Sequence, residues 1–118
     1  MDQLIRQEIA VVLQELEREL RRIERWESAM PSPERLASEV PFCHDTLEFT
    51  QWVQWIFIPR FRAVLEGGHA LPQACAIAPA AELALDPLEA DTSRLLAHLR
   101  EVDRLVTERT PAGGLGPN

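Results

Sequence analysis

The segment QWVQWIFIPRF, residues 51–61, decides how this chain folds. Its eleven residues hold two of the three Trp and two of the four Phe in the chain, together with two Ile and one Val. At about 100° per residue, these side chains wrap most of the circumference of a helix and cannot share one stripe. A helix of this kind must be surrounded by other elements, so we expect it at the centre of a helical fold.

Two amphipathic segments flank this aromatic helix. From Leu4 to Trp26, apolar residues recur every three or four positions with Glu and Arg between them. Near the end of the chain a second apolar stripe passes through Leu95, Leu99 and Val102. Each segment has one apolar face to bury, so both are expected to pack as long helices against the aromatic one.

Local signals predict the ends of the aromatic helix and a break inside it. Asp45, with Glu48 three residues later, is expected to cap its start. Glycines at 67–68 are expected to end it, because glycine tolerates the left-handed conformation found there. Pro59 removes a backbone hydrogen bond inside the helix, so we expect a bend near Pro59 or two abutting helices.

A short helix should precede the last long one, with Pro79 in its first turn and an end near Leu85. The predicted fold is therefore all-α, a four-helix bundle of three long helices and one short helix. The chain has room for one hydrophobic core, so residues 1–109 are expected to form a single domain. Residues 110–118, TPAGGLGPN, have the composition of a flexible tail.

Charge and hydropathy restrict the function. The net charge is −7, and all twelve basic residues are Arg. An acidic domain must overcome its own field to bind phosphates, so direct nucleic-acid binding is not favoured. We find neither a segment long and apolar enough to cross a bilayer nor a signal peptide, which predicts a cytoplasmic protein without membrane contact.

Candidate catalytic and metal-binding residues all have simpler explanations. Cys43, His44 and Asp45 adjoin in sequence, but neighbours seldom supply catalytic geometry. His98 and Glu101 lie three residues apart, and no second pair accompanies them to complete a di-metal site. We therefore expect no catalytic residues, no metal site and no cofactor.

The aromatic helix itself supplies the candidate binding residues. Gln54, Trp55 and Arg60 lie among the aromatics, and Trp and Arg are enriched at binding hot spots. One interpretation makes these three residues an exposed surface that recognises a partner. The other makes the whole segment core, with polar groups that reach past it to solvent.

The stretch PFCHDTLEFTQWVQWIFIPR, followed by LPQACAIAP, closely resembles the YqcC-like family of small bacterial proteins. The likeness covers about residues 4–108. Cys43, His44 and Cys75 depart from the family motif, which argues against thiol or metal chemistry. The matching positions that we expect to be structural are Phe42, Asp45, Trp52, Pro59 and Pro79.

This resemblance implies an all-helical four-helix bundle. Family function is formally unknown, and members are associated with tRNA pseudouridine synthase C, which implies an accessory role in tRNA modification. Our leading hypothesis is a non-enzymatic protein-interaction or accessory module with a protein partner, and a homo-oligomer is a further possibility. The alternatives are an accessory factor of a pseudouridine synthase that binds tRNA directly, and a small enzyme or small-ligand-binding protein.

Overall fold

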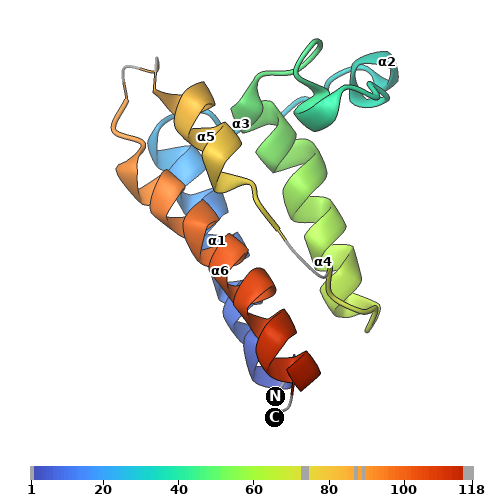
Figure 1. Cartoon of the computed structure of the whole chain (residues 1–118). Helices are drawn as coiled ribbons and strands as arrows, with labels where there is room; N and C mark the ends of the chain where they lie inside the picture. Colours follow the sequence, from blue (N-terminus) through green and yellow to red (C-terminus); the bar gives the residue numbers. More distant parts are fainter. Residues whose placement is uncertain (1, 73–74, 87, 89, 116–118) are drawn as a thin grey trace.

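The computed structural model describes residues 2–72, 75–86, 88 and 90–115, and every regular element in them is helical. The elements are α1 (Asp2–Arg22), α2 (Pro33–Leu36), a 3₁₀ turn (Pro41–Cys43), α3 (Phe49–Trp52), a π turn (Val53–Phe57), α4 (Ile58–Glu66), α5 (Ala78–Leu85) and α6 (Ser93–Leu115). The predicted all-α four-helix bundle is confirmed. Its long helices are α1, the continuous α3–α4 helix and α6, and its short helix is α5 (Figure 1).

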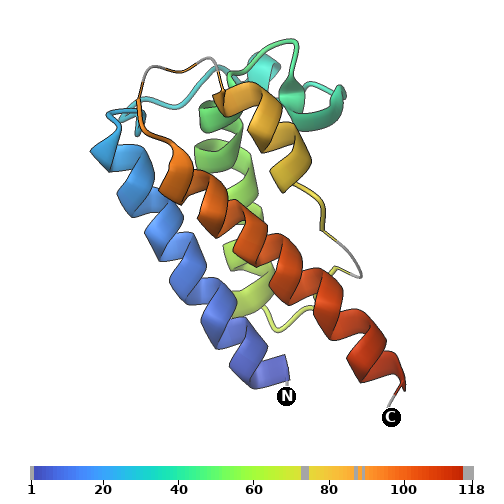
Figure 2. The ribbon, with the colours of Figure 1, turned by 60° about the vertical axis from the view of Figure 1, so that its left-hand side comes forward.

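The long helices share one core. Helices α1 and α6 run antiparallel along each other, and α4 packs on α1 while α5 packs on α6 (Figure 2). The largest fully buried side chains come from all three long helices: Ile9, Leu13, Leu16, Leu20, Val53, Ile58, Leu95, Leu99, Val102 and Val106. None of the described helices is long and apolar enough to cross a membrane.

The predicted irregularity at Pro59 takes the form of a π turn immediately before it. The Ile58 N–H donates to the Val53 carbonyl, five residues earlier, instead of the usual four. Pro59 has no N–H, and in a regular helix its ring crowds the carbonyl four residues back. The wider turn falls at this position and lets α3 continue into α4 as one helix.

Two helices end with the same hydrogen-bond pattern, and only one has the expected glycine. At the end of α4, Gly68 has φ +69°, and the His69 N–H donates to the Val64 carbonyl at 3.0 Å, as predicted from the two glycines. At the end of α1, Glu24 takes the left-handed position with φ 63°. The Arg25 N–H donates to the Leu20 carbonyl at 2.8 Å, so the same five-residue bond ends α1 at Arg22, before the expected end at Trp26.

The expected cap at Asp45 is wrong. The aromatic helix begins at Phe49, and the Gln51 side-chain oxygen accepts a hydrogen bond from the Glu48 N–H at 2.8 Å. Asp45 instead accepts a hydrogen bond from the Ser38 hydroxyl at 2.6 Å, within a turn that places Leu47 in the interior. The turn takes the place of the expected helix start, and burial of the Leu47 side chain stabilises it by about 1.5–3 kcal/mol.

Helix α6 extends past the boundary predicted at residue 109. It ends at Leu115, so the helix includes the first part of the segment expected to be a tail. The last part of that segment, residues 116–118, lies outside the described residues. The flexibility of residues 110–118 stays a prediction.

Helix α5 is capped by a side chain from α6. The Asp103 carboxylate accepts hydrogen bonds from the Ile77 N–H at 2.9 Å and the Ala78 N–H at 2.8 Å. These donors begin α5, and no side chain of the α5 segment itself caps them. Beside them, the Thr107 hydroxyl bonds the backbone N–H and carbonyl of Cys75, each at 3.1 Å. Helix α6 thus fixes where α5 starts.

Asp103→Ala should destabilise the domain by about 1–2 kcal/mol, the typical cost of losing a helix cap. Urea unfolding measures the loss, and hydrogen exchange at Ile77 and Ala78 should become faster. The matched control on the same helix is Glu101→Gln, which removes a charge from a half-exposed ion pair and should cost well under 1 kcal/mol. Equal losses for the two variants would contradict the capping role.

Candidate functional site

Gln54 is a structural residue. Its side chain is only 4% exposed. Its oxygen accepts a hydrogen bond from the Glu27 N–H at 2.8 Å, and its NH₂ group donates to the Glu27 carbonyl at 2.7 Å. The expectation of exposed Gln54 atoms is therefore wrong, because this amide is paired with the backbone of the segment that follows α1.

The Glu27 carboxylate completes this set of bonds, which we call the Glu27 network. It accepts hydrogen bonds from Trp55 Nε1 at 3.1 Å and from Gln51 Nε2 at 3.0 Å. Trp55 is half-buried, and its one hydrogen-bond donor is used within the chain. Arg60 is exposed and forms no hydrogen bond or ion pair with any described residue. The structure thus separates the three predicted partner-binding residues, and a binding role stays a prediction for Trp55 and Arg60.

Trp52 joins the aromatic residues into one group. Its ring stacks on Phe49 and Phe57, with centroids 5.9 and 5.5 Å apart, and meets Phe42 edge-on at 4.9 Å. Phe61 extends the group through Phe57 at 5.4 Å. All four Phe of the chain are therefore in ring contact with one another or with Trp52. At one end of the group, Phe42 and Phe49 lie at the surface of a hollow.

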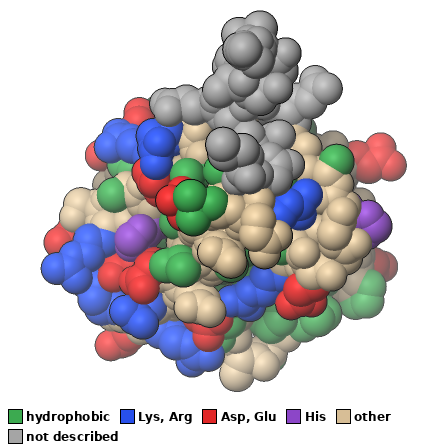
Figure 3. All heavy atoms as spheres, turned by 90° about the horizontal axis from the view of Figure 1, so that it is seen from below, with side chains coloured by type: hydrophobic (Ala, Val, Ile, Leu, Met, Phe, Trp, Pro, Cys, Tyr) green, Lys and Arg blue, Asp and Glu red, His purple; other side chains and the backbone are tan. Residues whose placement is uncertain are grey.

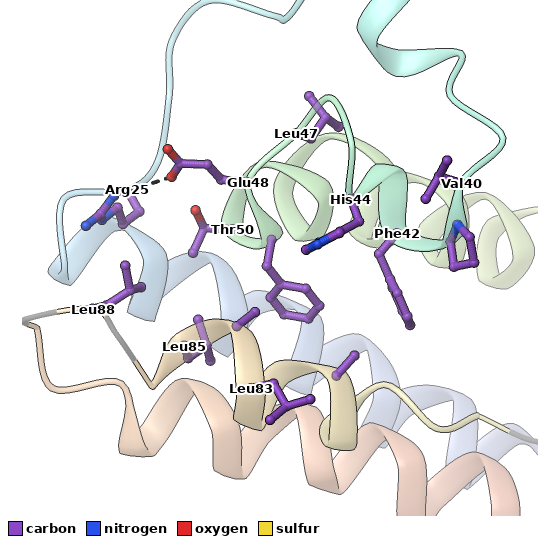
Figure 4. A pocket seen from close by; sticks show the side chains of 14 residues that line it. Arg25, Val40, Phe42, His44, Leu47, Glu48, Thr50, Leu83, Leu85 and Leu88 are labelled. Atoms are coloured by element: carbon purple, nitrogen blue, oxygen red, sulfur yellow. Dashed lines mark ion pairs between the residues drawn. The ribbon is translucent and has the colours of Figure 1, made fainter.

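This hollow, which we call the α5 cleft, is the candidate site. It lies between α5 and the segment 40–50 and has a volume of about 810 Å³, within the range of ligand pockets (Figure 4). One wall is α5, and the other is the segment 40–50. Its apolar lining consists of Val40, Pro41, Phe42, Leu47, Phe49, Ala80, Leu83, Ala84, Leu85 and Leu88.

Few polar groups line the α5 cleft. Arg25 and Glu48 form an ion pair across 3.6 Å at one end, and Thr50 and His44 add a hydroxyl and an imidazole (Figure 4). A site of this composition can hold apolar groups and orient a few polar ones. No Ser, Cys or Lys side chain is among its described lining residues.

The backbone is strained where the segment 40–50 lines the α5 cleft. Phe42 and Cys43 have φ of 59° and 50°, which is rare for residues other than glycine. The Cys43 N–H bonds the Val40 carbonyl at 2.8 Å, so the strained turn is closed by a hydrogen bond. Such strain persists only where the surrounding structure enforces it, and it is frequent at binding sites.

The residues that line the α5 cleft were not among the predicted binding residues. Ala80, Leu83 and Ala84 occupy a face of α5 different from the buried Ala81 and Leu85. The signal is present in the sequence APAAELAL, which is apolar on more than one side of the helix. A short helix with two apolar faces needs a second covering element.

The thiol of Cys75 is held in its protonated form. Burial raises its pKa to about 12, and a hydrogen bond to Asp103 and the negative charge of Asp103 act in the same direction. The thiolate is the nucleophilic form of cysteine, so Cys75 is inert near neutral pH. Among the described residues, no group of three or more His, Cys, Asp or Glu side chains is placed to hold a metal ion.

Basic side chains do not gather into a patch on the face drawn in Figure 3, where Arg alternates with Asp and Glu. Several Arg are already paired with Glu on the same helix, including Arg21 with Glu17 at 3.0 Å and Arg22 with Glu19 at 2.8 Å. Acidic side chains beside the Arg side chains weaken the positive field that this face presents to a phosphate backbone.

Comparison with known proteins identifies the family. The model of a family described as tRNA pseudouridine synthase C matches residues 8–105. The uncharacterised protein YqcC of Escherichia coli (strain K12) is 36% identical over 100 residues, which cover 85% of this chain and 92% of that protein. The chain belongs to the YqcC-like family. Another member, an uncharacterised protein of Haemophilus influenzae, is 37% identical over 93 residues, covering 79% of this chain and 87% of that protein.

The solved structure of a family member has the same fold. The solution NMR structure of YqcC from E. coli superposes with a TM-score of 0.77 at 35% identity, covering 88% of this chain and 89% of that chain. A further match is shorter: a protein of Pectobacterium carotovorum named tRNA pseudouridine synthase C is 39% identical over 59 residues. These residues are 50% of this chain and 16% of that protein.

Gln54→Ala should destabilise the domain by about 2–3 kcal/mol, because it leaves the part-buried N–H and carbonyl of Glu27 without their side-chain partner. Glu27→Ala keeps that pairing, because the pairing uses only the Glu27 backbone. It removes only the hydrogen bonds to the carboxylate, so we expect it to destabilise the domain by about 1 kcal/mol. Urea unfolding of both variants ranks the two. If Glu27→Ala is the more damaging, the backbone pairing is not what holds the segment after α1.

Cys75 should resist alkylation. At pH 8 a thiol with a pKa of about 12 has roughly a thousandfold less thiolate than an ordinary cysteine. In a Cys43→Ala background, iodoacetamide labelling of the folded protein should be correspondingly slow and should rise steadily with pH through pH 10. The same protein in urea is the control and should react at the normal rate. A rate that levels off near pH 9 in the folded protein would contradict the raised pKa.

Proposed function

We propose that this chain is a non-catalytic accessory module that binds a tRNA pseudouridine synthase through the α5 cleft. The observation that carries the proposal is the cleft itself, an open hollow whose described lining is mostly apolar. Large exposed apolar surfaces in small domains mark interaction sites. Leu83 on the cleft wall is 81% exposed, the most exposed large apolar side chain described.

The choice of partner rests on relatives. In the Pectobacterium protein named tRNA pseudouridine synthase C, the segment similar to this chain makes up 16% of the length. We take this as a YqcC-like segment joined to a synthase in one polypeptide. Two units that are joined in one bacterium are candidates for a complex in another, and linkage raises their effective concentration without any new contact. The family description supports the same partner.

A catalytic role for the chain itself has less support. The Cys75 thiol is protonated, and Gln54 and Trp55 use their polar groups within the Glu27 network. The α5 cleft supplies one imidazole, one hydroxyl and one ion pair, without a base oriented toward a nucleophile. An accessory role in tRNA modification would place the chain in the cytoplasm, where we expect its partner.

Direct tRNA binding is the second candidate function, and it rests on the family association alone. The net charge of −7 and the pairing of Arg with Glu oppose it. Phosphate contacts must weaken as salt rises, which makes this alternative separable by experiment. A gel shift of tRNA by the purified chain at low salt would support it.

Calorimetric titration of the chain with purified tRNA pseudouridine synthase C from the same bacterium tests the proposal. We expect a complex, and Leu83→Asp should weaken it by about tenfold or more, because a charge replaces an apolar contact at the cleft. The matched control is Leu4→Asp, another exposed leucine, at 62%, located on α1. Thermal unfolding should show both variants folded. The absence of any complex would refute the partner, and equal weakening by the two variants would refute the cleft.

A further inference from the structure

We infer that the α5 cleft receives an amphipathic helix of the partner, whose apolar stripe is flanked by Lys or Arg. This inference rests on the proposed function and states the chemistry of the segment that is bound. Three features of the cleft carry it: the shape of the α5 wall, the exposed apolar edges, and the charge around them.

The α5 wall has the shape of a helix-packing surface. Ala80, Leu83 and Ala84 are spaced as i, i+3 and i+4 on one face of α5, and the lining continues to Leu88. At 1.5 Å per residue the helical part of this surface is only about two turns long. Alanines four residues apart leave a groove beside the Leu83 ridge, and such grooves accept the side-chain ridges of another helix.

The edges of the α5 cleft are apolar and unusually exposed. Leu83 rises from α5 and is 81% exposed, and Val40 on the opposite wall is 42% exposed (Figure 4). The Phe42 and Phe49 rings also line the cleft, and the aromatic group holds them in place through Trp52. A partner helix with apolar residues at i, i+3, i+4 and i+7 can contact the two edges and these rings, which is the common mode of helix-in-groove recognition.

Charge around the α5 cleft selects a basic partner. Five exposed carboxylates are in or next in sequence to its lining: Glu39, Asp45, Glu48, Glu82 and Asp86. Arg25 pairs with Glu48 and Arg100 with Glu82. Glu39, Asp45 and Asp86 have no basic side chain within ion-pair distance among the described residues. With a net charge of −7 on the whole chain, an acidic peptide would be repelled and a basic one attracted.

Two synthetic helical peptides test this inference by fluorescence anisotropy. The basic probe is LKKLLKLLKKLLKL, and the acidic probe is LEELLELLEELLEL, which has the same apolar stripe. We expect the basic probe to bind about tenfold or more tightly than the acidic one. Leu83→Asp should weaken its binding although it adds a negative charge, whereas Leu4→Asp should not. The double variant Glu39→Gln, Asp86→Asn should weaken the basic probe severalfold without unfolding, because neither carboxylate is paired.

Each outcome of these measurements supports or overturns the inference. Equal binding of the two probes, or binding that Leu83→Asp leaves unchanged, overturns the inference. A dimer of the unmodified chain that Leu83→Asp dissociates in light scattering also overturns it, because a second copy then covers the cleft. If the synthase binds at the cleft while the probes show no preference, the inference fails and the proposed function stands. If the probes behave as expected and the synthase does not bind, the proposed partner fails and the cleft chemistry stands.

Discussion

The structure depends on covering a helix that is apolar on nearly every side. The α3–α4 helix, Phe49–Glu66, presents Val53, Ile58 and Phe61 to the core shared with α1 and α6. Its opposite side is covered by the chain between α1 and α3, where Ile56 packs with Cys43 and Leu47. A chain of 118 residues has few elements left for the remaining side. Near Phe49, the 3₁₀ turn that carries Phe42 and the two-turn helix α5 both contact α3, and the α5 cleft between them stays uncovered.

The Glu27 network holds the chain between α1 and α3 against the aromatic helix. The segment after α1 has little regular structure, so its position depends on side-chain bonds to the aromatic helix. Gln54 pairs with the Glu27 backbone much as a neighbouring strand would, and Trp55 and Gln51 fix the Glu27 carboxylate. Fully satisfied networks of this kind specify one packing arrangement, because any shift leaves a buried group without a partner. Polar residues among aromatics thus stabilise the fold here.

The sequence predicts those features whose cause is local. The two long amphipathic stripes, the left-handed Gly68 and the Pro79 helix start follow from periodicity and backbone preference, and all appear in the structure. The failures have non-local causes. Gln54 is buried by a segment 27 residues away, and Asp45 loses its capping position to a turn that buries Leu47. The two walls of the α5 cleft come from segments thirty or more residues apart, and the one local signal for the cleft is the second apolar face of α5.

The central claim is that a partner covers the α5 cleft and leaves the Trp55–Arg60 side of the aromatic helix free. Hydrogen exchange with mass spectrometry, on the chain alone and in saturating tRNA pseudouridine synthase C from the same organism, tests it most directly. The account predicts slower exchange in peptides from residues 40–50 and 78–86, with residues 54–62 unchanged. Protection confined to residues 54–62, with the two walls of the cleft unchanged, would contradict it.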